Sequence, residues 1–319
     1  MKDELFSGIV GHQQALQLLT ATLNTNRLAP AYLFAGPEGV GRSLVALRFI
    51  EGIFTKQISN KQVGDFGLTA DLGLRRRLEL SNHPDLLLVE PTYSDKGVLI
   101  PVSKAKADGL QKKALPQLRL EQIREVARFL ARSPLEAPRS VVLLEGAERM
   151  AEAAANALLK TLEEPGQGLL ILLTAAPEKL LSTILSRCMR IPFRPLPPAE
   201  LAQVMAIDAD STELLALAAG SPGALLEWRS RWQELPEFLI TALAELPANP
   251  LAALRLASEI CEQLDVEQQI WLLGLWQRRL WQQTSDPSPL KRLELLRKHL
   301  QGNVQPRLAW EVALLNLCA

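Results

Sequence analysis

The stretch that decides the fold is AYLFAGPEGVGRS, residues 31–43. Its first five residues are apolar and predict a buried strand, and the residues after Arg42 have a helical pattern. Between them, Gly36, Gly39 and Gly41 form a glycine-rich turn of the type that holds phosphate oxygens with loop amides and a helix N-terminus. The spacing fits the phosphate-binding loop G-x-x-x-x-G-K-[ST], except that Arg42 replaces the lysine. The sequence therefore predicts a nucleotide-binding domain that is altered at the residue handling the β- and γ-phosphates.

Bulk composition limits the class of protein. At 319 residues the chain is long enough for two or three domains. Lys+Arg and Asp+Glu both count 35, so overall charge does not drive binding to nucleic acid or to an anionic membrane. The three cysteines, Cys188, Cys261 and Cys318, lie too far apart in sequence for a zinc module or a disulfide framework. With no apolar leader and no run of membrane-spanning length, we expect a soluble cytoplasmic protein without a membrane partner.

The order of apolar runs predicts an α/β fold followed by helices. Near-continuous apolar runs at 31–35, 86–90, 141–145 and 169–174 alternate with helical patterns, which is typical of a parallel sheet covered on both faces. From the proline cluster at 195–198 onward, only helical patterns remain. We therefore expect three domains: an α/β domain at 1–195, a small helical lid at 196–235 and an all-helical domain at 236–319.

Two stretches, 52–82 and 91–118, have the composition of insertions. The second holds five lysines and two aspartates, a net charge of 5 − 2 = +3. It is either a local contact for a phosphate backbone or a solvated loop.

Residues expected around the phosphate loop argue against efficient catalysis. A predicted strand ends at Glu145, the place where a P-loop protein holds an acid for its magnesium shell. The next position is Gly146, which cannot polarise an attacking water; Glu148 either substitutes for it or is an acid at a helix N-terminus. Arg42 is bulkier than lysine and lacks its point-like charge, whereas Ser43 is retained. Residual binding of ATP, ADP or magnesium stays open, and efficient hydrolysis is not expected.

One arginine outside the loop has two interpretations. Arg187 lies in the run Ser182–Cys188, after a helix expected to begin near Ala176. The segment Arg190–Phe193 after it is interpreted as chain leaving the domain edge. Arg187 is either a structural salt-bridge residue or an arginine finger that stabilises phosphoryl transfer in a neighbouring subunit.

Taken together, these features resemble the AAA+ clamp-loader family, and the matching motifs span nearly the whole chain. Leu158–Pro165 (LLKTLEEP) combined with Ser186-Arg187-Cys188 at this spacing is the most specific match. The other matching motifs are Ile9–His12, Asn26–Phe34, His83-Pro84-Asp85, Gly220–Gly223 and Asn303–Leu308.

The resemblance implies a RecA-like domain with a small lid and a helical collar. Motor subunits of this family keep a loop lysine, a second acid and an arginine on the sensor-two helix. Here Arg42, Gly146 and Gly223-Ala224 stand at those places. The implied nucleotide site is therefore degenerate, and it consists of Gly36, Gly39, Gly41, Arg42, Ser43, Glu145 and Thr174. Many relatives carry a four-cysteine zinc module after the loop helix, but 52–82 contains no cysteine, so neither zinc nor any other required cofactor is expected.

The resemblance also implies partners. We expect a subunit that is no enzyme in isolation but joins the gamma/tau motor subunits and the delta subunit, and reaches the sliding clamp and primer–template DNA through that complex. Arg187 would then act in trans as the catalytic arginine finger. Two alternatives stay open: an active AAA+ ATPase, as a divergent motor subunit or a branch-migration-type helicase, and a scaffold that uses no nucleotide.

Overall fold

The structure, a computed structural model, describes residues 4–59, 71–95, 97–109, 114–164, 166–205, 212–236, 238–239, 247, 249–283, 287–302 and 304–318. The chain divides into two compact units. The first comprises Met1–Thr92 and Gln117–Arg229, and the second Tyr93–Pro116 and Ser230–Ala319. The three-domain division with limits at 195 and 235 stays a prediction.

The first unit is built on a five-stranded parallel sheet with the order β2-β5-β6-β1-β7. Its strands, in that order, are Leu86–Val89, Val141–Leu144, Leu169–Thr174, Ala31–Ala35 and Met189–Pro192. The first four coincide with the four predicted apolar runs. The segment interpreted as chain leaving the domain is itself the edge strand β7, with Phe34 opposite Ile191. Only one of its four residues is fully buried, so it lacks the apolar run that identified the others.

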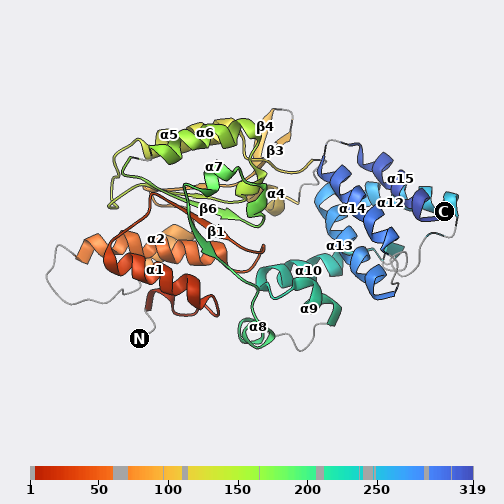
Figure 1. Ribbon diagram of the computed structural model, residues 1–319, viewed down its shortest axis with the longest axis horizontal. Coiled ribbons are helices and arrows are strands. Elements are labelled where there is room, and N and C mark those ends of the chain that lie inside the picture. Colours follow the sequence, from red (N-terminus) through yellow and green to blue (C-terminus); the bar gives the residue numbers. More distant parts are fainter. Residues whose placement is uncertain are drawn as a thin grey trace. The chain divides into compact units, whose positions relative to one another are not determined.

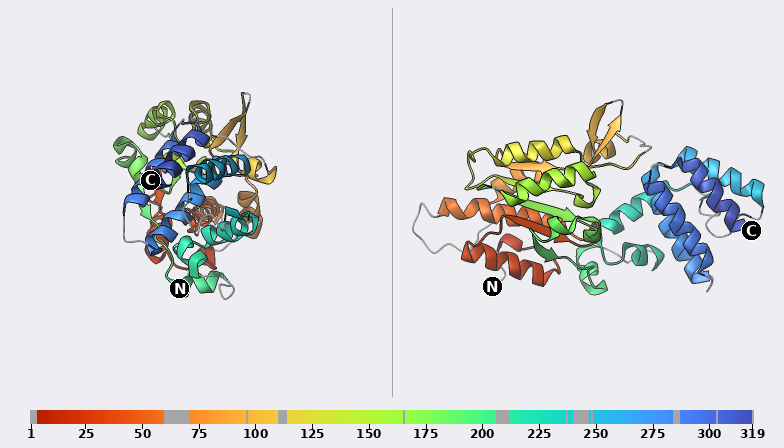
Figure 2. Two further views of the ribbon diagram at one scale, coloured as in Figure 1. Left: turned by 90° about the vertical axis from the view of Figure 1, so that its right-hand side faces the viewer. Right: turned by 45° about the horizontal axis from the view of Figure 1, so that its top comes forward.

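Helices cover both faces of this sheet (Figure 1). On β1, Tyr32 and Phe34 belong to one core and Leu33 to the other, because successive strand residues point to opposite faces. The first core packs under α1 (Gln13–Thr25), α2 (Arg42–Ser59) and α3 (Leu72–Glu79), and the second under α5 (Leu120–Leu130), α6 (Glu152–Glu163) and α7 (Ser182–Leu185). Figure 2 shows the same layers from a second direction. The predicted α/β fold with a parallel sheet is confirmed.

Helices follow the sheet, as the sequence predicts. They are α8 (Pro198–Val204), α9 (Thr212–Ala218) and α10 (Pro222–Glu234), and α10 runs past the end of the first unit. The Leu196 N–H donates to the carbonyl oxygen of Gly220 over 2.8 Å, which ties the start of this segment to the turn before α10.

The second unit contains a hairpin and a group of long helices. The hairpin strands β3 (Thr92–Asp95) and β4 (Val98–Pro101) precede α4 (Val102–Ala107), within the stretch predicted as an insertion. Of its five lysines, only Lys104 and Lys106 lie in the described part, so the +3 charge stays an untested prediction.

The long helices are α12 (Pro250–Gln263), α13 (Val266–Gln283), α14 (Ser288–Gln301) and α15 (Pro306–Cys318). Consecutive members from α13 to α15 pack on one another, and α15 also packs on α12. Their core contains the stacked rings of Trp276 and Trp310, and the Trp310 Nε1–H donates to Gln269 Oε1 over 2.9 Å. The expected all-helical C-terminal region is present. Over the described ranges, no helix combines the length and the apolar character needed to cross a membrane.

Candidate functional site

The phosphate loop connects β1 to α2 and is anchored on the neighbouring strand. The Gly36 N–H donates to the carbonyl oxygen of Thr174, the last residue of β6, over 3.1 Å. A β-carbon on Gly36 would lie 2.4 Å from the carbonyl oxygen of Phe193, so only glycine fits there. Gly39 and Gly41 have φ of 73° and 110°, a region that side chains disfavour. The predicted loop thus has the backbone conformation that its glycines permit.

The two residues expected near magnesium lie in contact. The Ser43 hydroxyl, in the first turn of α2, donates to Glu145 Oε1 over 2.9 Å at the carboxyl end of β5. Burial raises the pKa of Glu145, and the bond from Ser43 opposes this shift. Thr174, the third residue expected there, is fully buried, and its hydroxyl oxygen accepts a hydrogen bond from the Ala176 N–H over 3.2 Å.

Arg42 lies among carboxylates at the start of α2. Burial lowers the pKa of its guanidinium, whereas the charges of Glu148, Glu38 and Glu145 act to raise it. Its Nη1 is buried and has no hydrogen-bond acceptor among the residues that the structure describes. Buried donors are normally paired, so this nitrogen is available to an anionic group at the loop.

Gly146, which stands in the sequence where a second acid is expected, follows Glu145 at the end of β5. Its φ is 61°, and a β-carbon there would lie 3.0 Å from Pro91 Cγ. Any side chain at this position is therefore strained. The backbone conformation at Gly146 thus disfavours an acidic residue there, in addition to the absence of a carboxylate. The nearby Glu148 accepts a hydrogen bond from the Ala175 N–H over 3.3 Å and so has a structural partner.

The N-terminus of α10 packs directly on the phosphate loop. The Gly223 N–H donates to the carbonyl oxygen of Gly39 over 2.8 Å. A β-carbon on Gly39 would lie 2.3 Å from the Ala224 nitrogen, and one on Gly223 would lie 2.8 Å from Gly39 Cα. A second contact to the loop comes from His12, whose Nε2 lies 2.9 Å from the carbonyl oxygen of Val40. Backbone of Gly223 and Ala224 therefore contacts the loop, at the place where the resemblance led us to expect the sensor-two helix.

Arg187 lies just after α7, at the surface of the first unit. Its Nη2 donates to Glu163 Oε1 over 2.8 Å and its Nη1 to the Thr183 carbonyl oxygen over 3.1 Å. The Arg187 side chain is 36% exposed and that of Glu163 53%. The single helix expected before it is divided into a 3-10 helix, Pro177–Lys179, and the four-residue α7. A salt bridge is thus present, and its exposure leaves Arg187 accessible from outside.

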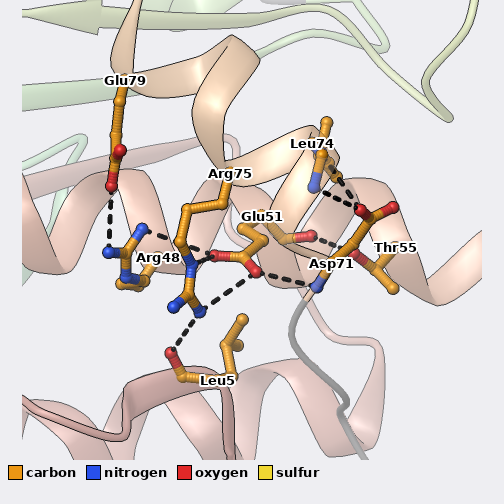
Figure 3. Close-up of polar contacts among 9 residues, drawn as sticks. Leu5, Arg48, Glu51, Thr55, Asp71, Leu74, Arg75 and Glu79 are labelled. Carbon is orange, nitrogen blue, oxygen red and sulfur yellow. Dashed lines mark hydrogen bonds and ion pairs between the residues drawn. The ribbon is translucent and has the colours of Figure 1, made fainter.

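Sequence reasoning missed a buried ion-pair cluster between α2 and α3 (Figure 3). The Glu51 carboxylate is fully buried and accepts hydrogen bonds from Arg75 Nε at 2.9 Å, Arg75 Nη2 at 3.2 Å and the Asp71 N–H at 3.2 Å. Arg48 Nη1 lies 3.6 Å from it, and Arg75 also donates to the Leu5 carbonyl oxygen. The sequence did contain a signal for this cluster, because Glu51 is a lone acid inside the apolar run 49–54.

The His83-Pro84-Asp85 motif has a structural role. The Asp85 carboxylate accepts hydrogen bonds from the N–H groups of Leu135, Glu136 and Ala137 at 2.6–2.7 Å, which fixes the loop before β5. Burial raises the pKa of Asp85, but these three bonds together outweigh it and hold the pKa below its ordinary value.

Within the described ranges, no group of three or more His, Cys, Asp or Glu side chains is placed to hold a metal ion. The absence of zinc stays a prediction, since part of the insertion at 52–82 lies outside those ranges.

A parallel sheet with a glycine loop after β1, an acid at the end of β5 and a helical lid on the loop defines a P-loop domain of the AAA+ class. Residues 11–197 match the family described as DNA polymerase III, delta subunit, and residues 199–317 match the cyanobacterial DNA polymerase III delta prime C-terminal domain. The chain therefore belongs to the delta prime family of DNA polymerase III clamp-loader subunits.

Individual relatives agree with this membership. The DNA polymerase III subunit delta' of Bacillus subtilis is 33% identical over 186 residues, which cover 58% of this chain and 48% of that protein. The tau/gamma subunit of Haemophilus influenzae is 27% identical over 236 residues, 70% of this chain and 30% of that protein. This chain thus spans half or less of the length of both. A DNA polymerase III gamma subunit-related protein of Thermotoga maritima shares the fold with a TM-score of 0.54 and 16% identity, over 94% of this chain and 98% of the other.

Proposed function

We propose that this chain is an ATP-silent subunit of a DNA polymerase III clamp loader and that it supplies Arg187 in trans to the nucleotide site of an adjacent motor subunit. Its partners are the gamma/tau motor subunits and the delta subunit. Through that complex it helps to open the sliding clamp and to load it onto primed DNA in the cytoplasm.

The proposal that this chain does not hydrolyse ATP is supported by three changes in and around its own phosphate loop. Arg42 cannot present the compact ammonium that a lysine brings to the phosphates. Gly146 lacks a carboxylate, and general-base catalysis contributes roughly 10²- to 10⁴-fold to a rate. Gly223 brings backbone rather than a guanidinium to the loop, with its N–H bound to Gly39. Each change removes a different catalytic contribution, so no single reversion restores turnover.

Loss of turnover is compatible with residual binding of ATP or ADP. Ser43 and Glu145 keep the pair of oxygen ligands that magnesium prefers. The buried Nη1 of Arg42, which has no acceptor among the described residues, is a donor for a phosphate oxygen. Nucleotide held in this way would act as a structural ligand.

The chemistry and the position of Arg187 support the trans role. A guanidinium is always charged and forks onto phosphate oxygens. In head-to-tail rings, the edge of one subunit meets the active site of the next. An exposed arginine beside an edge strand is suited to such a contact, and its bond to Glu163 is accessible to solvent rather than enclosed in the core.

Reconstitution tests the function. The isolated chain should hydrolyse ATP far below an ordinary enzyme rate of about 1 s⁻¹. Omitting it from a mixture of motor and delta subunits, clamp and primed DNA should abolish loading. Turnover at ordinary rates by the isolated chain would favour an active ATPase instead. Failure to join the motor subunits would favour a scaffold of another assembly.

A further inference from the structure

We propose that Glu163 is a positioning residue that holds the Arg187 guanidinium in the orientation from which it reaches a neighbouring subunit's nucleotide. This inference rests on the proposed trans role of Arg187, and it assigns the carboxylate at the end of α6 a task in that role.

The contacts of Arg187 leave most of its donors available. Glu163 Oε1 and the Thr183 carbonyl oxygen each engage one terminal nitrogen, at 2.8 and 3.1 Å. A guanidinium has five N–H groups in a rigid fork. Two are used, and the other three have no acceptor among the residues that the structure describes. The pair therefore fixes the plane of the fork without occupying its remaining donors.

Glu163 provides a more rigid anchor than α7, which contributes only the Thr183 carbonyl oxygen. α7 has only four residues, and the chain after it continues directly to the edge strand. Glu163 ends the twelve-residue α6, whose inner face is fixed in the core by Ala154, Leu158 and Leu162. A long side chain held by a partner on such a rigid helix loses little further entropy when it binds phosphate.

The exposure of the pair favours orientation over stability. Ion pairs between exposed side chains contribute little to folding. Preorganised donors, in contrast, lower the barrier of phosphoryl transfer because they require no reorganisation when charge develops. The Glu163 carboxylate should therefore affect the rate of phosphoryl transfer at the neighbouring site more than the stability of the folded subunit.

Glu164 supplies a matched control. It carries the same charge at the same helix end, is exposed, and has no hydrogen bond or ion pair with Arg187 among the residues that the structure describes. Replacing either glutamate changes the net charge equally, so only the loss of the bond to Arg187 separates the two variants.

The test uses the full complex, assembled from motor subunits that are active only at the site adjacent to this chain. Glu163→Ala should lower kcat for DNA-stimulated ATP hydrolysis by up to about five-fold, the upper end of what an exposed ion pair contributes, with KM for ATP unchanged. Glu163→Gln, which keeps an oxygen acceptor, should fall between Glu163→Ala and the unaltered chain. Glu164→Ala should behave as the unaltered chain, and neither alanine variant should change the Tm of the free subunit.

The double variant separates this inference from the proposed function. If Arg187→Ala leaves kcat unchanged, the trans role itself fails. If Arg187→Ala lowers kcat but Glu163→Ala does not, the positioning role is overturned while the trans role stands. Adding Glu163→Ala to Arg187→Ala should have no further effect, because a positioning residue acts only through the group it holds. A further fall in kcat would also overturn the positioning role.

Discussion

The buried carboxylate of Glu51 should be the most sensitive charged position in the first unit. Replacing it by Gln conserves volume and leaves an oxygen that can still accept from the Asp71 N–H. The substitution removes the negative charge between Arg75 and Arg48, which are themselves only 16% and 12% exposed.

The structure sets the size of this effect. Glu51 is fully buried and accepts two hydrogen bonds from Arg75. Removing one partner of a buried ion pair leaves an uncompensated charge and typically costs about 3–5 kcal/mol. Arg48 retains Glu79 at 3.0 Å, so we expect the low end of this range, about 3 kcal/mol.

Urea unfolding measured with two probes can assign this loss to the correct unit. Of the six tryptophans, all but Trp228 lie in the second unit, so their fluorescence reports mainly on that unit. Circular dichroism measures the helix content of both units. A loss of about 3 kcal/mol, with an m-value of about 2–3 kcal/mol/M, lowers the midpoint by roughly 1–1.5 M. The shift should appear in the dichroism transition of the first unit and leave the fluorescence transition in place.

Glu79→Gln is the matched control. It removes a partly exposed partner of Arg48 and should cost about 0.2–1 kcal/mol. If Glu51→Gln is no more destabilising than Glu79→Gln, the cluster does not stabilise the α2–α3 pair and the reasoning fails.

Three further outcomes follow from the contacts described. Asp85→Asn should lower the free energy of unfolding by about 2 kcal/mol near neutral pH. Because the folded pKa of Asp85 lies below its unfolded value, this difference from the unaltered chain should shrink as pH falls through the lowered pKa. A difference that stays constant down to the acid transition would contradict the role of the Asp85 carboxylate. Gly39→Ala should loosen α10 from the loop, because its β-carbon would lie 2.3 Å from the Ala224 nitrogen, and hydrogen exchange at the Gly223 amide should accelerate; unchanged exchange would rule out the contact. A chain truncated after residue 235 should remain folded but no longer co-purify with motor subunits, and retention as tight as that of the full chain would show that the C-terminal helices are not the main assembly contact.

The elements that the sequence predicted are those with a local signal. β1 and β6 have the predicted bounds because each is a continuous apolar run between polar or glycine boundaries. β7 escaped prediction because only Ile191 of its four residues is fully buried, so the strand contains no continuous apolar run. The hairpin β3–β4 lies in a stretch whose lysines and glycines resemble those of a loop.

The same distinction applies to the site. The spacing of the motif residues predicted the Ser43–Glu145 neighbourhood, because a strand, a turn and a helix fix where those side chains lie. The motifs did not predict that Gly223 would donate to Gly39, because this bond joins backbone of two segments that no strand-and-loop pattern places side by side. The bond between Arg187 and Glu163 is equally non-local, so the sequence left both interpretations of that arginine open.

The most direct test of the central claim is the DNA-stimulated ATPase of the reconstituted complex with Arg187→Ala, measured beside the Tm of the free variant. Arginine fingers contribute roughly 10³- to 10⁵-fold at the site they serve. If Arg187 acts in trans, turnover of the complex should fall partially, because the other motor sites keep their own arginines, while clamp loading falls further and the Tm of the free subunit changes little. A destabilised free subunit that restores normal turnover once assembled would show that Arg187 is a structural salt-bridge residue and would contradict the proposed function.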